Sequence, residues 1–308
     1  MVAVVWGSSF FAVNRIADSH TVLAMLVLRF GLVLPVLGFA ARRALRGLGW
    51  REWAGGAALG LILGAVFLLE TYGSVSTSVT NAGLIISLTM VITPLAESAI
   101  TRTRLPRAFA LAAVLSVLGV ALLTGERGFQ ALNLGDLLVF GAAVARTVNV
   151  LAMSRTRAIR RTDPLALTWI QLAGATVVFA IGAACTGSSP WALARSFGPV
   201  QWALLLHLAL LCTLFAFFVQ LWAVRATSPS RVSLLLGTEP VWAAVFGIGI
   251  AGERPGLLGL FGVLLILAGT EWGRRSTAPA AAAAAAVAAA SAGPPEVRPV
   301  AAGAATGT

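Results

Sequence analysis

The sequence predicts an all-α polytopic membrane protein with ten transmembrane helices, and three observations carry that prediction. Hydrophobic residues make up 58% of the 308 residues, charged residues make up only 11%, and the mean hydropathy is +0.91. Soluble globular domains carry about a quarter charged residues, so this chain has too few to cover a water-facing surface. Apolar runs of spanning length recur along the chain, and the arginines are grouped in the segments between them.

Ten apolar segments are candidates for membrane spans, because a spanning helix needs about 20 mostly apolar residues. The connections between most of them are short, so successive helices are expected to be antiparallel neighbours. The segments cover residues 2–17, 21–41, 53–73, 79–99, 107–124, 136–153, 164–185, 201–224, 231–250 and 256–273.

The arginines predict the orientation in the membrane. With the N-terminus placed in the cytoplasm, fifteen arginines fall in cytoplasmic segments and three, Arg127, Arg195 and Arg254, fall on the opposite side. Arginine-rich loops stay in the cytoplasm. We therefore expect a multi-pass protein of the inner or plasma membrane with both termini cytoplasmic. The net charge of +11 comes from these scattered clusters, so no nucleic-acid partner is predicted.

The chain also resembles itself. Residues 77–119 align on residues 227–269 without a gap and with eight identities, although leucine-rich helices also match by chance. Each half holds five predicted helices, and an odd number makes the second half enter the membrane from the opposite side. We expect two inverted five-helix repeats at 1–125 and 126–275, with a disordered Ala/Pro/Gly-rich tail at 276–308. Inverted repeats place a site near the midplane, between the halves.

Several short motifs occur in an order that identifies a family. Trp6-Gly7-Ser8-Ser9-Phe10 opens the first helix, Leu28-Arg29-Phe30 lies in the second, and Gly135-Asp136 opens the second half. The stretch from Leu208 to Gly269 then contains Ser228-Pro229, Glu239-Pro240, Gly252-Glu253-Arg254, Gly262 and Gly269. In order and spacing, residues 1 to about 273 resemble EamA-domain transporters of the drug/metabolite transporter superfamily.

The resemblance implies a secondary transporter that exports or exchanges small metabolites, such as amino acids or drug-like compounds, by alternating access. Its partners would be a small-molecule substrate, with a coupling proton as an option, and the lipid bilayer. The sequence departs from the family pattern where Met90 replaces a usual Pro, Thr103 a usual Glu, and Arg146 a usual aromatic residue. No P-loop occurs in the chain, which favours secondary transport.

Charged residues at membrane depth are the first candidates for a substrate site, because each costs about 2.5–3.5 kcal/mol at a helix centre. Arg146 and Asn149 share a face of the sixth predicted helix, and a shift of 140 residues aligns them with Trp6 and Ser9. Glu239 precedes a proline in the ninth. We expect these five residues to line one midplane cavity. Two functional arrangements are expected. Either Arg146 pairs directly with Glu239, or the two residues bind opposite ends of a zwitterionic substrate. A purely structural ion pair between Arg146 and a glutamate is an equal alternative.

Two more polar residues join the predicted substrate site. Asn14 lies in the first predicted helix, and Glu70 lies toward the outer end of the third. The alternative for Glu70 is a solvent-exposed position at the entrance of the cavity, without a role in binding. Gly56, Gly60 and Gly64 form a repeated small-residue pattern, which favours packing within the chain over a homodimer interface. A homodimer stays an open alternative.

Other functions are less well supported by the residues. A channel, a lipid flippase or a non-transporting scaffold are alternatives, but no filter sequence or ring of like charges is found. An intramembrane enzyme is disfavoured, because the chain has no metalloprotease or nucleophile-elbow motif, and Asp136 has no second intramembrane aspartate. Cys185, Cys212, His20 and His207 lack metal-ligand spacing, so neither a metal nor a cofactor is predicted.

Overall fold

The computed structural model describes residues 1–102, 107–125, 133–156, 159, 162–216, 218–219, 239–254 and 256–291, and all its regular elements are helices. Some residues on which the sequence predictions depend lie outside these ranges. They are Thr103, Arg104, Arg127, Arg157, Arg160, Arg161, Arg225, Thr227, Ser228, Pro229, Arg231 and the tail beyond Ser291. The disorder predicted for residues 276–308 stays a prediction.

The helices of the first half follow the predicted spans, with one break. The fourth span divides at Leu88, where the hydroxyls of Ser87 and Thr89 donate to the carbonyls of Leu84 and Ile86. Such side-chain bonds compete with the helix and bend it. The elements are α1 (Val2–Ile16), α2 (Val22–Arg46), α3 (Trp50–Ser76), α4 (Val79–Ser87), α5 (Thr89–Thr101) and α6 (Arg107–Gly125).

The second half contains two π-helical segments and one short helix that the hydropathy pattern does not predict. In the first π-helix the Thr213 hydroxyl donates to the carbonyl of Leu208, five residues back, as the wider turn allows. The described elements are α7 (Leu134–Arg155), α9 (Pro164–Thr186), α10 (Pro190–Ser196), α11 (Pro199–Leu206), η1 (His207–Phe215), α14 (Glu239–Ala244), η2 (Val245–Ile250) and α15 (Leu257–Ser291).

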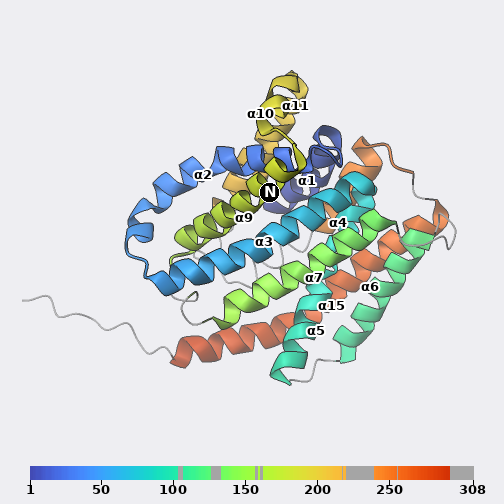
Figure 1. Cartoon of the computed structure of the whole chain (residues 1–308). Helices are drawn as coiled ribbons and strands as arrows, with labels where there is room; N and C mark the ends of the chain where they lie inside the picture. The colour runs from blue at the N-terminus through green and yellow to red at the C-terminus, as the bar shows by residue number, and fades with distance from the viewer. Residues whose placement is uncertain are drawn as a thin grey trace, which may run out of the picture.

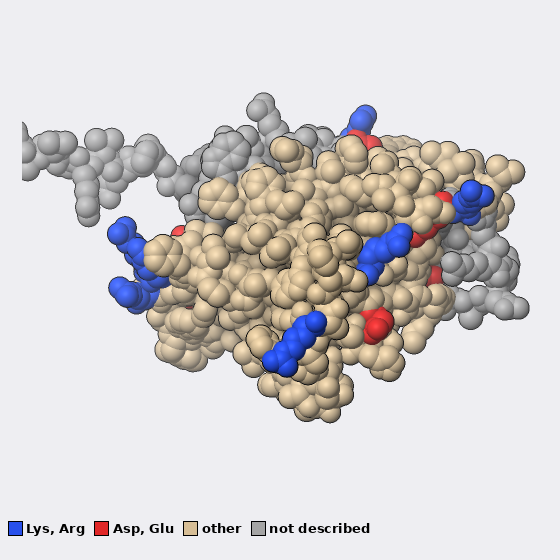
Figure 2. All heavy atoms as spheres, turned by 90° about the horizontal axis from the view of Figure 1, so that it is seen from above, with Lys and Arg blue, Asp and Glu red and all other residues tan. Residues whose placement is uncertain are grey.

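Five described helices are long and apolar enough to cross a membrane: Val22–Arg46, Trp50–Ser76, Val79–Thr101, Leu134–Met153 and Pro164–Thr186. Five shorter apolar helices fall on the other predicted segments. Large apolar side chains cover the outside, with Leu61, Val117 and Leu257 all more than half exposed. Charged side chains are few on the face shown in Figure 2. The protein is therefore an all-helical membrane protein.

Close helix packing depends on small residues. A Cβ atom on Gly60 would lie 2.9 Å from the Gln171 carbonyl oxygen, and one on Gly56 would lie 2.8 Å from Ile170, so α3 touches α9. This confirms the prediction that the glycines of α3 pack within the chain. Figure 1 shows α3 between α9 and α7, and shows α6 running along α15. Phe30 of α2 packs against Phe67 of α3 and Phe179 of α9 in one buried cluster.

Candidate functional site

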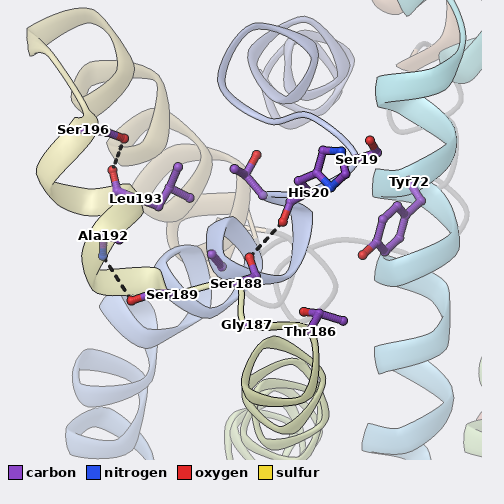
Figure 3. Close-up of a pocket in the computed structure, with 12 residues that line it drawn as sticks. Ser19, His20, Tyr72, Thr186, Gly187, Ser188, Ser189, Ala192, Leu193 and Ser196 are labelled. Atoms are coloured by element: carbon purple, nitrogen blue, oxygen red, sulfur yellow. Dashed lines mark hydrogen bonds between the residues drawn. The ribbon is translucent and has the colours of Figure 1, made fainter.

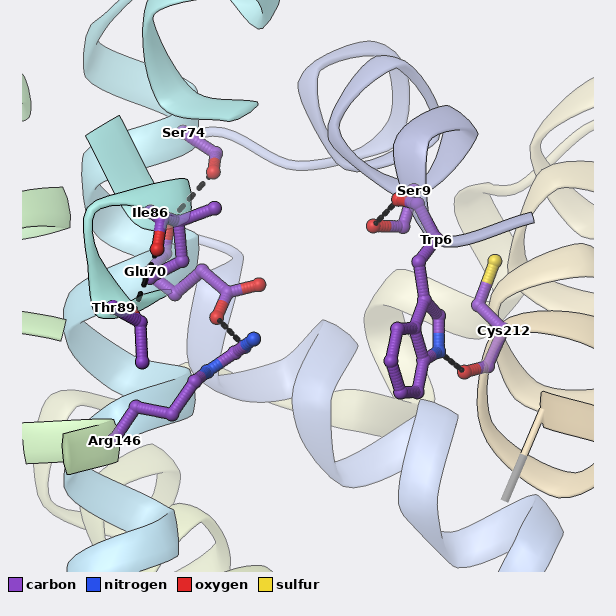
Figure 4. A network of polar contacts seen from close by, with 8 residues as sticks. All are labelled: Trp6, Ser9, Glu70, Ser74, Ile86, Thr89, Arg146 and Cys212. Atoms are coloured by element: carbon purple, nitrogen blue, oxygen red, sulfur yellow. Dashed lines mark hydrogen bonds and ion pairs between the residues drawn. The ribbon is translucent and has the colours of Figure 1, made fainter. Parts of the chain in front are cut away.

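An ion pair in the described interior joins α3 to α7. Arg146 Nη2 lies 2.6 Å from Glu70 Oε2, and the two side chains are 32% and 14% exposed. The helices approach closely here because Gly73 faces Val139 and the carbonyl of Gly135. Figure 4 shows the carboxylate and the guanidinium pointing toward one another from the two helices. A 2.6 Å charge-assisted bond is short and strong.

This contact corrects one of the two arrangements expected for Arg146. The direct partner of Arg146 is Glu70, whereas the sequence favoured Glu239. The physical reason is the close α3–α7 packing, which the hydropathy pattern does not reveal. Glu239 is the first described residue of α14 and forms no ion pair with a described residue, but Arg146 and Glu70 both act on it electrostatically. Two carboxylates and one guanidinium therefore lie in one region.

Trp6 and Ser9 hold a second polar position, on α1. The Trp6 indole Nε1 donates to the Cys212 carbonyl at 2.9 Å, inside η1, and the Ser9 hydroxyl donates to the Trp6 carbonyl at 2.6 Å. In Figure 4 the Trp6 ring and the Glu70–Arg146 pair project from opposite sides of the view. Each of these two polar positions joins an element of the first half to one of the second, α1 to η1 in one and α3 to α7 in the other.

The remaining predicted site residues are Asn149, one turn from Arg146 on α7, and Asn14 on α1. Asn149 is only 6% exposed, and its Oδ1 has no hydrogen-bond partner among the described residues. Asn14 is exposed, and its amide donates to the carbonyls of Ser74 at 3.0 Å and Thr77 at 3.5 Å. Asn14 therefore lies at the end of the bundle where α3 ends and α7 begins, which we call the Asp136 end.

The sequence did not predict two polar contacts that connect η1 to the first half, Ser8–His207 and Arg29–Thr213. The Ser8 hydroxyl lies 2.7 Å from the Val5 carbonyl and forms a 2.8 Å hydrogen bond with His207 Nε2. His207 thereby connects η1 to α1. Arg29 donates from Nε to the Thr213 hydroxyl at 3.2 Å, and its guanidinium lies over the rings of Phe30 and Phe67, so it connects α2 to η1.

The sequence also did not predict that Asp136 and Glu253 accept hydrogen bonds from the start of α4 and the residues before it. The Thr77 hydroxyl and the Asn81 amide donate to Asp136 Oδ1, and Glu253 accepts from backbone amides at the start of α4. The sequence signal that could have found them is the pair of capping residues Ser78 and Asn133, which mark helix starts beside these acids.

A pocket of about 530 Å³ also opens at the Asp136 end (Figure 3). It lies between the α1–α2 connection, Tyr72 of α3 and the α9–α10 connection, and hydroxyl groups dominate its lining. The Ser188 hydroxyl donates to the His20 carbonyl across it. None of the predicted substrate residues lines this pocket, which differs in place from the midplane cavity expected from the repeat. No group of three potential metal ligands occurs among the described residues.

Comparison with known proteins agrees with this architecture. An uncharacterized transporter of Archaeoglobus fulgidus is 26% identical over 275 residues, which cover 87% of this chain and 81% of that protein. A solved structure described only as a crystal structure of protein has the same fold, with a TM-score of 0.59 and 19% identity over 88% of this chain and 93% of that chain. The profile of the EamA-like transporter family matches residues 1–125 and 133–271. The chain therefore belongs to the EamA-like transporter family.

Proposed function

We propose that this chain is a secondary transporter that exports or exchanges small metabolites, such as amino acids or drug-like compounds, by alternating access. The proposal includes ten spans as two inverted five-helix repeats at 1–125 and 126–275, with both termini cytoplasmic. The match of the family profile to two successive regions and the ten apolar segments support it. A substrate site between the halves would use Trp6, Ser9, Asn14, Glu70, Arg146, Asn149 and Glu239.

The observation that carries the proposal is the group of charges on α3, α7 and α14. Glu70 and Arg146 form a direct ion pair while Glu239 stays without one among the described residues. Charges at membrane depth are expensive and are retained mainly where they serve transport or pair with one another. One pair with a third charge beside it provides both a cationic and an anionic contact for a solute.

A zwitterionic metabolite fits this group best. Its carboxylate would share the Arg146 guanidinium with Glu70, because a guanidinium has five N–H donors, and its ammonium would bind Glu239. The solute would thus add two ionic contacts and leave the Glu70–Arg146 pair in place. A proton on Glu239 would compete with the ammonium, which is a simple route to proton coupling. Asn149 would add a hydrogen bond through its unpartnered Oδ1. Asn14, at the Asp136 end, would lie on the path rather than in the midplane site.

Efflux of amino acids and their toxic analogues from a strain that lacks the gene tests this function. Wild-type protein should lower the internal level of at least one solute, whereas Arg146→Met and Glu239→Gln should fail to do so. If both variants transport at the wild-type rate, these residues are tolerated polar groups and the proposed site is wrong. No movement of any solute, together with binding of a partner protein, would favour a scaffold.

Reporter fusions test the topology separately. Fusions after Arg46 and Arg161 should read cytoplasmic, and a fusion after Gly128 should read external. A cytoplasmic signal after Gly128 would contradict the arrangement of five plus five spans, even if transport itself were demonstrated.

A further inference from the structure

We propose that Glu253 is an inter-half latch, which keeps the Asp136 end of the protein closed by binding the first backbone amides of α4. The inference deepens the proposed function and rests on it, because a latch at one end matters only if the two halves alternate. It assigns a role in conformational change to a residue outside the proposed substrate site.

The contact joins residues from the two regions that the family profile matches. Glu253, which follows η2, accepts hydrogen bonds from Val79 N at 2.5 Å and from Thr80 N at 2.9 Å. These are the first amides of α4, which have no partner inside the helix. A carboxylate is favoured at such an end, because the helix dipole is positive there. Water can replace it when the halves separate, so the bond is strong but reversible.

The surroundings of the carboxylate are shaped for it. A Cβ atom on Gly247 would lie 2.7 Å from Glu253 Oε2 and 2.9 Å from Thr80 N, so only glycine leaves this approach open. The Thr80 hydroxyl is 2% exposed and has no hydrogen-bond partner among the described residues. A buried hydroxyl without a partner costs free energy. Separation of η2 from α4 would let water reach this hydroxyl, which makes opening easier.

Glu253 differs from the other groups that bind the same turn. Asp136 is buried and takes its donors from the side chains of Thr77 and Asn81, whereas Glu253 is half-buried and its donors among the described residues are backbone amides. Its neighbour Gly252 has φ +75°, a left-handed backbone that favours glycine, and the turn here lets the Glu253 amide donate to the Gly247 carbonyl of η2 at 3.0 Å. Glu253 is therefore the contact best placed to break while the rest of the end stays folded.

The internal repeat does not duplicate the Glu253 carboxylate. Under the shift of 150 residues that aligns the two halves, Glu253 corresponds to Thr103, which has no carboxylate. The repeat therefore does not place a second latch carboxylate at the equivalent position in the opposite end of the bundle. We infer that the Asp136 end is the more strongly closed of the two when no solute is bound.

Labelling of the natural thiol Cys212 measures the opening. Cys212 is buried beside Trp6, and the exposed Cys185 is first replaced by serine. Losing one charge-assisted hydrogen bond changes a two-state equilibrium by about tenfold. Glu253→Gln should therefore raise the rate of Cys212 labelling by a membrane-impermeant maleimide about tenfold, when added from outside to intact cells. Glu253→Asp, whose shorter carboxylate reaches fewer amides, should give a smaller increase.

The matched control is Glu52→Gln. Glu52 also accepts a backbone amide at a helix start, from Gly49 N at 2.7 Å, but within one half. It should label like the parent. Equal labelling of Glu253→Gln and the parent, in protein that elutes as a single folded species, would overturn the latch. An equal increase in both variants would also overturn it, as general loosening. Faster labelling without movement of any solute would leave the latch standing and remove the proposed transport function.

Discussion

The two polar regions of this protein use acidic side chains in opposite ways. At the Asp136 end, both oxygens of Glu253 accept backbone amides, and Asp136 accepts from two side chains. In the interior, Glu70 has one short bond to Arg146, and Glu239 has no direct partner among the described residues. In the first region the carboxylates connect helices, whereas in the second region carboxylate oxygens stay available to bind a further ligand.

The difference gives a physical criterion for separating structure from function in this fold. A carboxylate whose acceptor sites are filled by the chain resists substitution because its donors lose their partner. A carboxylate with unfilled sites is expensive at membrane depth and gains most when a solute or proton arrives. Asp136 should therefore matter to stability, and Glu239 should matter to transport.

The largest effect on stability is expected for Arg146→Met. It strands Glu70 in the interior, which costs about 2–4 kcal/mol, below the figure for a fully dry pair because Arg146 is 32% exposed. The melting temperature in lipid nanodiscs measures the loss. Combining Arg146→Met with Glu70→Gln should restore the protein level but not transport. Failure of the double variant to restore it would show that the pair does not account for the loss.

Gly73→Val comes next and tests whether both regions depend on the α3–α7 approach. A Cβ atom on Gly73 would meet Val139 and the Gly135 carbonyl, and overpacking of this kind costs about 1–3 kcal/mol. Because it moves α3 from α7, it should weaken both the Thr77–Asp136 contact and the Glu70–Arg146 pair. Gly141→Val is the control on the same helix pair, since a Cβ there lies 3.6 Å from Leu69. Equal melting temperatures for the two variants would contradict the role assigned to Gly73.

Asp136→Asn addresses the Asp136 end directly. The amide keeps one acceptor oxygen but loses the charge that strengthens the bonds from Thr77 and Asn81, so about 1–2 kcal/mol of stability should be lost. Thermal unfolding followed by circular dichroism measures it. A variant as stable as the wild type would mean that the acids at this end are not structural, and the comparison between the two regions would fail.

Glu239→Gln should impair transport and leave stability nearly unchanged, the reverse of Asp136→Asn. Its stability should stay within about 0.5 kcal/mol of the wild type, because no direct partner among the described residues is lost. Uptake into everted vesicles of the solute identified in the efflux assay should nevertheless fall about tenfold, as expected for one lost charged contact. A variant with full transport and reduced stability would reverse the assignment of Glu239.

The smallest effect is expected for Asp18→Asn, in the connection between α1 and α2. A hydrogen bond from the Thr21 hydroxyl holds the pKa of Asp18 below its usual value, and backbone amides of His20 and Thr21 add to this. A lowered pKa stabilises the fold above the unfolded pKa, and this contribution disappears as the pH falls through the folded pKa. The small difference in melting temperature from the wild type should be present at neutral pH and vanish in acid.

The number and order of apolar segments were determined by the sequence alone, since hydropathy is a local property and membrane depth sets the length required. Five of the predicted segments coincide with helices long enough to span a membrane, and the other five overlap shorter apolar helices among the described residues. The family was also recognisable, because its motifs are short and their spacing survives in the chain. The breaks at Leu88, η1 and η2 were not predicted, since they arise from hydroxyl bonds and packing between helices distant in the sequence.

Which charge meets which was decided only by the tertiary structure. Arg146 and Glu239 are both intramembrane charges by sequence count, but the glycine contact between α3 and α7 brings Glu70, 76 residues away, to 2.6 Å. The same holds for Glu253, whose partners are 174 and 173 residues distant. Pairing depends on helix rotation and axial position to within a few ångströms, and an apolar pattern that tolerates many registers does not encode it.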